Sequence, residues 1–195
     1  MSNAIDNPPQ LDFTALLKRS WGLFQERPLE HLVAGLVVVA LSAATLGLLA
    51  GPLLVGHIRM IERQQRGEPI RIEDVFAGFR DFAPAFVTSL IVLVAVMLGT
   101  LLLVLPGLFV AAAWSFALWF VALHRASSGE ALRASWELLK AQASSVVVVL
   151  LLAFVANAVA GSVLLATLLT APLSTIFCTL AFQELVRRQP DQLPR

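Results

Sequence analysis

The chain has 195 residues, of which 58% are hydrophobic and only 14% are charged, and its formal net charge is +1. A soluble domain of this size is about 45–50% apolar and about 25% charged, so this composition excludes an ordinary soluble domain. A net charge so close to zero gives no support to nucleic-acid binding, and we expect no nucleic-acid partner.

The first residues and the last residues differ from the rest of the chain. Residues 1–10 are polar, contain Pro8 and Pro9, and lack the basic start and short apolar core of a cleavable signal peptide. We expect a disordered leader over 1–10, a single transmembrane domain over 11–188 and a flexible tail over 189–195.

Three long segments between these ends contain no charged residue. They lie between Glu30 and Arg59, between Asp81 and Arg125, and between Lys140 and Glu184. Uncharged apolar stretches longer than about 18 residues are typical of membrane-spanning helices. The second and third segments each exceed 40 residues, which is enough for two spans. The pattern predicts an all-α integral membrane protein.

A short amphipathic segment precedes each uncharged segment. In each one, apolar residues at i, i+4 and i+7 place three side chains on one helical face, with polar residues opposite. These residues are Leu17, Trp21 and Phe24; Ile72, Phe76 and Phe79; and Leu132, Trp136 and Leu139. We expect three helices that lie along the cytoplasmic membrane interface, with Trp21, Phe76 and Trp136 as interfacial anchors.

A proline lies near the middle of each uncharged segment, at Pro52, Pro106 and Pro172. Proline removes a backbone donor and disfavours helix at the preceding residue, so each should end one apolar helix and begin the next. The chain would then hold three related units, each an amphipathic helix followed by a hairpin of two spans. The units would cover about 11–66, 70–125 and 129–188. The competing interpretation is that any multi-span protein alternates apolar runs with amphipathic loops.

The first uncharged segment leaves the choice between five and six spans open. Leu29 to Ala50 is long enough to cross a bilayer, but a return helix from Pro52 must continue to about Gln65, past Arg59, in order to cross. We expect Glu62 to pair with Arg59 or Arg63 on this helix. A single tilted span from Leu29 to Ile58 is the alternative. We favour about six spans, in three hairpins, because six spans place all 14 Lys and Arg residues on one side, which the positive-inside rule makes the cytoplasm, with both termini there.

The sequence contains no catalytic constellation, cofactor-binding loop or metal-ligand spacing, so we expect no enzyme, no cofactor and no metal. The candidate contact residues lie at the cytoplasmic ends of the first and third return helices, where charge close to the membrane is costly. They are His57, Arg59, Glu62, Arg63, Glu184, Arg187 and Arg188. Such groups can bind anionic lipid headgroups or another membrane protein. The simpler interpretation is that they only extend into cytoplasmic water.

Several short motifs occur in an order that resembles a known group of proteins. They are Gly51-Pro52 with Gly56 and Arg59, then Ile72–Phe79, Leu105–Phe109, Trp114–Ala117, Gly129–Leu132 and Ala134–Lys140. In this order they resemble uncharacterised bacterial membrane proteins allied to the membrane domain of some glycerophosphoryl diester phosphodiesterases. The resemblance implies a multi-pass protein of the bacterial cytoplasmic (inner) membrane. It carries over no catalytic residue, because the phosphodiesterase active site lies in a separate soluble domain.

The sequence therefore predicts a non-enzymatic integral membrane protein that acts as a membrane-embedded scaffold or as a lipid- or partner-binding module. The alternative is a small transporter or channel component, which normally carries polar groups near the membrane midplane. Asn157 is the most polar residue deep in a predicted span, and we expect it to join helices rather than to bind a solute. Ligand, partner and oligomeric state stay open.

Overall fold

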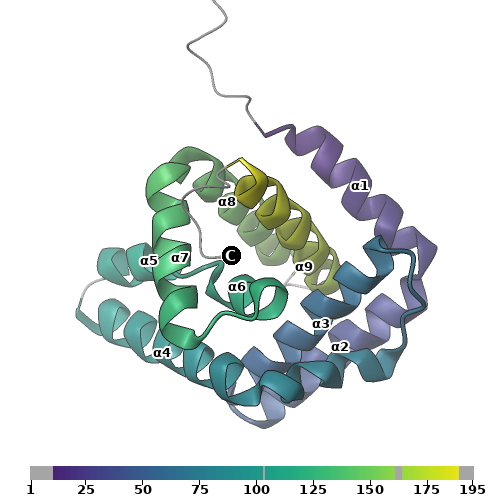
Figure 1. Ribbon diagram of the computed structural model, residues 1–195, viewed down its shortest axis with the longest axis horizontal. Helices are drawn as coiled ribbons and strands as arrows, with labels where there is room; N and C mark the ends of the chain where they lie inside the picture. The colour runs from purple at the N-terminus through teal and green to yellow at the C-terminus, as the bar shows by residue number, and fades with distance from the viewer. Residues whose placement is uncertain (1–10, 103, 161–163, 189–195) are drawn as a thin grey trace, which may run out of the picture.

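The computed structural model describes residues 11–102, 104–160 and 164–188, and these residues form helices and turns without a β-strand (Figure 1). The all-α fold class is confirmed, whereas the expected leader and tail lie outside the described residues. The helices are α1 (Phe13–Glu26), α2 (Pro28–Ala44), α3 (Ala50–Gln65), η1 (Ile72–Asp81), α4 (Phe82–Leu102), α5 (Val104–Ala113), α6 (Ala117–His124), α7 (Ser128–Ala141), α8 (Ala143–Ala160) and α9 (Leu164–Arg187).

Among the residues that the structure describes, three to five helices are long and apolar enough to cross a membrane. Ile72–Leu102, Leu105–His124 and Leu169–Arg187 qualify alone, and α2 and α8 qualify when each is joined to the helix before it. The chain is therefore compatible with a multi-pass membrane protein. α3 is not among these helices, since it has 16 residues and carries several charged side chains.

Two of the predicted amphipathic segments form helices that lie almost at right angles to the apolar helix that follows. The angle is 98° between α1 and α2 and 106° between α7 and α8. Asp12 accepts a hydrogen bond from the Ala15 N–H at the start of α1, and Glu130 accepts one from the Ser127 N–H at the start of α7. A helix that lies in the membrane plane before a spanning helix requires this geometry.

The second amphipathic segment differs, because it forms a 3₁₀ helix, η1, that continues into α4 without a break. η1 packs backbone to backbone against α3. A Cβ on Gly56 would overlap the backbone oxygen of Val75, and a Cβ on Gly78 would overlap that of Pro52. Only glycine permits two backbones to approach this closely, so the two glycines fix η1 against α3.

The residues of the predicted apolar faces are only partly buried. α1 buries Leu16, Ser20, Leu23 and Phe24, which leaves Leu17 49% exposed and Trp21 45% exposed. η1 likewise buries Val75 and Gly78 and leaves Phe76 exposed. The buried residues of each segment are therefore shifted by about one position from the predicted apolar face. Large apolar side chains of that face remain on the surface.

The first two prolines lie where the sequence predicts them. Pro52 and Pro106 each stand in the first turn of a helix, α3 and α5 respectively. The chain turns over residues 45–49, with positive φ at Leu46 and Gly47. A single helix from Leu29 to Ile58 is therefore not formed.

The prediction for the third proline is wrong, because Pro172 lies inside α9 and no turn forms there. In the third uncharged segment, α8 ends at Ala160 and α9 begins at Leu164. α2 packs closely on the proline ring, since a Cβ on Gly35 would lie 3.0 Å from the Cδ of Pro172. This tertiary contact helps to offset the backbone hydrogen bond that proline removes from a helix interior.

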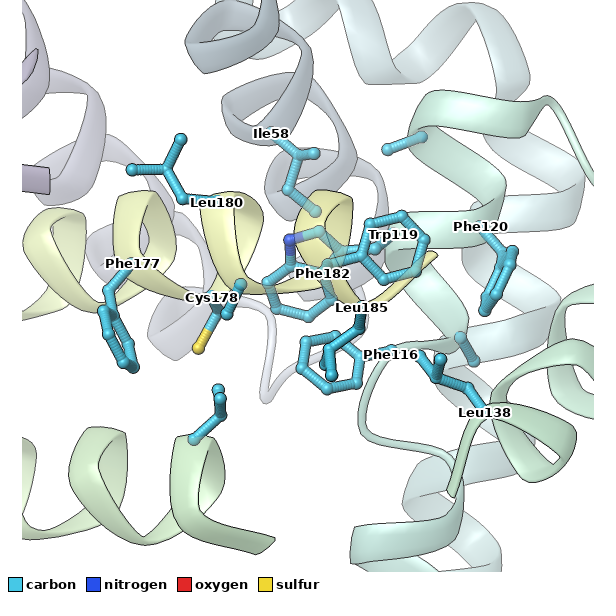
Figure 2. Packing of buried hydrophobic residues seen from close by; sticks show 14 of the residues in the cluster. Ile58, Phe116, Trp119, Phe120, Leu138, Phe177, Cys178, Leu180, Phe182 and Leu185 are labelled. Atoms are coloured by element: carbon cyan, nitrogen blue, oxygen red, sulfur yellow. The ribbon is translucent and has the colours of Figure 1, made fainter. Parts of the chain in front are cut away.

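The centre of the molecule is formed by α3, α6 and the C-terminal half of α9 (Figures 1 and 2). Phe182 of α9 lies between Phe116 and Phe120, with ring centroids 5.6 and 4.8 Å away. In contrast, α4, α5 and α8 expose large apolar side chains, such as Leu101 at 84% and Phe154 at 70%. Such a surface is unfavourable in water and suits lipid.

The two ends of each uncharged segment lie close together. In the first, the ring centroids of His31 and His57 are 6.0 Å apart. In the second, Arg125 donates to Asp81 Oδ2 at 2.7 Å, and in the third, Gln142 Nε2 donates to the Leu185 carbonyl at 2.8 Å. Each uncharged segment thus ends next to where it began.

Candidate functional site

Arg59 was expected at a helix end exposed to water, but the structure buries it, with 8% of the residue exposed. Its Nε donates to the Ala122 carbonyl at 2.9 Å and its Nη2 to the Val121 carbonyl at 3.4 Å, both in α6. Its Nη2 also lies 2.5 Å from the carboxylate of Asp81. A cation close to helix carbonyls and an acid is stabilised there, so Arg59 joins α3 to α6 and η1 rather than reaching into water.

Asp81 forms ion pairs with two arginines, because Arg125 donates to the same carboxylate oxygen as Arg59. Arg125 follows the last residue of α6 and has a positive φ of 54°. Its side chain is two-thirds exposed, whereas that of Arg59 is 10% exposed. The charges of Asp81 and Arg59 are thereby paired, and Arg125 faces outward.

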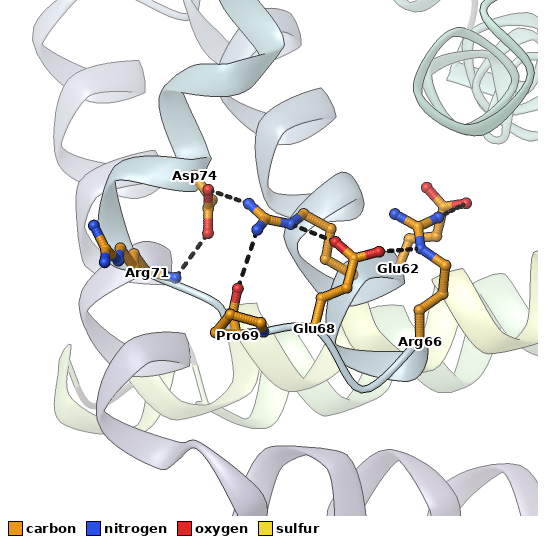
Figure 3. A network of polar contacts seen from close by, with 7 residues as sticks. Glu62, Arg66, Glu68, Pro69, Arg71 and Asp74 are labelled. Carbon is orange, nitrogen blue, oxygen red and sulfur yellow. Dashed lines mark hydrogen bonds and ion pairs between the residues drawn. The ribbon is translucent and has the colours of Figure 1, made fainter.

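A second polar network holds the loop between α3 and η1 (Figure 3). Arg63 pairs with Asp74 at 2.5 Å and with Glu68 at 3.0 Å, and Arg66 pairs with Glu68 at 2.7 Å. The hydrogen bonds from Arg66 and Arg63 lower the pKa of the Glu68 carboxyl below its ordinary value. Glu62 pairs with Arg66, one turn along α3, so the predicted pairing of Glu62 with Arg59 or Arg63 is wrong.

A cavity of about 560 Å³ lies between α3, η1 and the end of α6, and we name it the η1 cavity. Five arginines and two carboxylates provide its charged lining: Arg59, Arg63, Arg66, Arg80, Arg125, Glu62 and Asp74. Within the described part of the chain, Arg80 has no carboxylate partner, whereas the other four arginines do. This excess of cations suits an anionic ligand.

A second cavity of about 460 Å³, here named the α9 cavity, lies between α1, α3, α6 and α9. Its charged lining is Arg19, Glu62, Arg66 and Arg187, and two of these charged residues, Glu62 and Arg66, also line the η1 cavity. Glu62 at the end of α3 and Arg187 at the end of α9 thus line the same cavity. The sequence named both residues as candidates without indicating that they share a site.

Other predicted contact residues lie away from the two cavities. His57 is 1% exposed, with its ring 6.0 Å from that of His31, so its predicted contact with headgroups or a partner is wrong. Glu184 pairs with Arg187 at 3.8 Å and with Arg188 at 3.3 Å on its own helix and lines neither cavity. These two charges of α9 are therefore partly neutralised by a local acid.

The three predicted anchors have different surroundings. Trp21 and Phe76 are 45% and 46% exposed on α1 and η1. Trp136 of α7 is partly buried, packs edge-on against Phe109 at 5.7 Å, and has the Lys140 ammonium 5.7 Å from its ring centre. All three present an apolar ring at the surface of a helix that precedes an apolar helix.

Asn157 makes two hydrogen bonds from Nδ2, to the Ala153 carbonyl and to Ser174 Oγ, both 2.7 Å long. The second bond joins α8 to α9. The amide group that is deepest in the uncharged segments is thus engaged in helix packing.

Sequence reasoning missed Arg19, Arg80, Arg125 and Asp81. One signal was available for two of them, since Asp81 and Arg125 are the charged residues that bound the second uncharged segment. If that segment turns back, its two ends must meet. Arg19 and Arg80 belong to amphipathic segments and carry no local signal that distinguishes them from solvated charges.

Comparisons of the chain with protein-family models, with curated proteins and with solved structures find no match. The resemblance to the phosphodiesterase-associated membrane domain therefore stays a prediction that depends on its motifs.

Proposed function

We propose that this chain is a non-enzymatic protein of the bacterial cytoplasmic membrane that binds anionic lipid headgroups on its cytoplasmic side. The proposal depends on the η1 cavity, where four carboxylates pair with four of the five arginines and Arg80 has no ion-pair partner among the described residues. Arginine binds phosphate through two parallel N–H donors. The cytoplasmic leaflet supplies such phosphates as lipid headgroups.

The proposed arrangement in the membrane has six spans in three hairpins: α2 with α3, α4 with α5 and α6, and α8 with α9. Its support is that each uncharged segment ends beside its start, through the contacts of His57, Asp81 and Gln142. The right-angled α1 and α7 would lie in the interface. The charged ends of α3, α6 and α9 then share the cytoplasmic side with both termini, in agreement with the positive-inside rule.

The alternative of a transporter has weaker support. The Asn157 amide already has two partners in the helix pair α8–α9, and a solute would have to displace one of them. The charged groups gather instead at one end of the central helices, where a headgroup arrives from the membrane surface.

The test is native mass spectrometry of the protein in detergent, titrated with dioleoyl phosphatidylglycerol or with dioleoyl phosphatidylcholine. We expect preferential binding of phosphatidylglycerol, and weaker binding by Arg80→Gln. Arg133→Gln is the matched control, because Arg133 is an exposed arginine of α7 that lines neither arginine-rich cavity. Equal binding of the two lipids, or equal loss in both variants, would contradict the proposal.

A further inference from the structure

The η1 cavity and the α9 cavity adjoin each other. Glu62, Arg66 and Leu123 line both, so the ion pair between Arg66 and Glu62, 2.9 Å long, stands between them. Each cavity has a volume within the range of about 300–1,000 Å³ that is usual for ligand sites. Two anionic groups could therefore bind side by side, one on each side of Arg66.

Each cavity contains one arginine that has no ion-pair partner among the residues that the structure describes. It is Arg80 in the η1 cavity and Arg19 in the α9 cavity, and both side chains are exposed. The remaining arginines of the two cavities each lie within 4 Å of a carboxylate. One uncompensated guanidinium on each side of a shared arginine is an arrangement for two phosphates rather than one.

The α9 cavity shows a further unfilled binding group. The Nε2 of Gln65 is buried and has no hydrogen-bond partner among the described residues, and Gln65 lines this cavity. A buried amide donor without an acceptor is costly, and a phosphate oxygen would satisfy it. Leu123 and Val186 provide a partly exposed apolar wall in the same cavity, which suits the glycerol and upper acyl carbons of a lipid.

We infer that the two cavities form one site for a lipid with two phosphate groups joined by a short linker. Arg80 binds one phosphate, Arg19 and Gln65 bind the other, and Arg66 lies between them. The inference depends on the proposed headgroup binding and adds the ligand class to it. Since the second phosphate binds intramolecularly once the first is held, such a lipid binds more tightly than two separate single-phosphate lipids.

The experiment compares tetraoleoyl cardiolipin with dioleoyl phosphatidylglycerol at equal phosphate concentration, on the full chain in detergent, by native mass spectrometry. We expect the wild type to bind cardiolipin at least about tenfold more tightly. Arg19→Gln and Arg80→Gln should each abolish this preference, because each reduces cardiolipin binding far more than it reduces phosphatidylglycerol binding, whereas Arg133→Gln should retain it. Circular dichroism of each variant verifies that it is folded.

The outcomes separate the two proposals. If phosphatidylglycerol binds in preference to phosphatidylcholine but cardiolipin binds no better, the two-phosphate site is contradicted and headgroup binding stands. If neither anionic lipid binds better than phosphatidylcholine, both proposals are contradicted. A last arm adds glycerol 1,3-bisphosphate as a soluble competitor at the concentration of cardiolipin. Failure to displace the lipid supports the lipid assignment, and full displacement overturns it in favour of a soluble bisphosphate.

Discussion

The central helices and the peripheral helices differ in which side chains they bury. α3, α6 and the C-terminal half of α9 bury nearly every apolar side chain and carry charges at their ends. α4, α5 and α8 have no charged residue and expose their largest apolar side chains. This contrast shows that hydrophobicity alone does not identify the core of this protein, because α6 lies in the centre whereas α4 and α5, which are about equally apolar, face outward. The buried helices are the ones that make charged contacts near their ends and pack against aromatic rings.

The comparison is tested most strongly by the matched pair Phe182→Ala and Phe154→Ala. Phe182 is fully buried and Phe154 is 70% exposed. We expect Phe182→Ala to lower the free energy of unfolding by about 3–5 kcal/mol, because it leaves a cavity, and Phe154→Ala to change it by less than about 0.5 kcal/mol. Urea unfolding in mixed micelles, followed by circular dichroism, measures both. Equal losses would show that the periphery is packed as tightly as the centre.

The glycine contact between α3 and η1 gives the next largest effect. A Cβ on Gly56 would overlap the backbone of Val75, so we expect Gly56→Ala to cost about 3 kcal/mol in the same unfolding measurement. Gly22→Ala is the control, since no atom lies within 4 Å of the added Cβ. That control should be neutral or slightly stabilising, because alanine favours helix. A tolerated Gly56→Ala would refute the close approach of the two backbones.

Asp81→Asn tests the buried ion pair that sets the centre apart. The substitution leaves Arg59 buried without its acid, and we expect a loss of about 2–3 kcal/mol. Glu137→Gln removes an exposed pair with Lys140, 2.8 Å long, and should cost less than about 1 kcal/mol. Thermal unfolding of the two variants measures the loss of stability in each. Similar shifts in both would mean that water reaches Arg59.

The smallest effect is expected for Asn157→Leu, which removes the bond between α8 and α9. Hydrogen bonds between helices in lipid contribute about 0.6–2 kcal/mol, and leucine restores some packing, so the loss should lie near the lower value. Ser174→Ala should give a similar loss, and the double variant should lose no more than either single variant. Solute flux into proteoliposomes, abolished by Asn157→Leu, would instead favour the transporter alternative.

Patterns of charge and amphipathicity were sufficient to predict much of the fold. The amphipathic segments around Trp21 and Trp136 form the expected helices, and Pro52 and Pro106 begin helices as proline should in a first turn. Pro172 could not be predicted, because its helix is packed against Gly35, which lies 137 positions away in the sequence.

The site was predictable only in part, for a related reason. Charge near a helix end identified Arg63, Glu62 and Arg187, but the burial of Arg59 depends on carbonyls of α6 that lie more than 60 residues away. Such contacts are a property of the packed structure. The sequence indicates which charged side chains are costly to place near a membrane. Which of them are paired with an opposite charge depends on how the helices pack.

In the proposed arrangement, each uncharged segment leaves the cytoplasmic side and returns to it. Single cysteines at Leu46 and Leu101, which are 89% and 84% exposed near the first two turns, test it against cysteines at Glu68 and Arg133. The native Cys178 is buried. With a membrane-impermeant maleimide on intact cells, the account predicts labelling at 46 and 101, and labelling at 68 and 133 only after permeabilisation. Labelling of all four positions from the same side would contradict it.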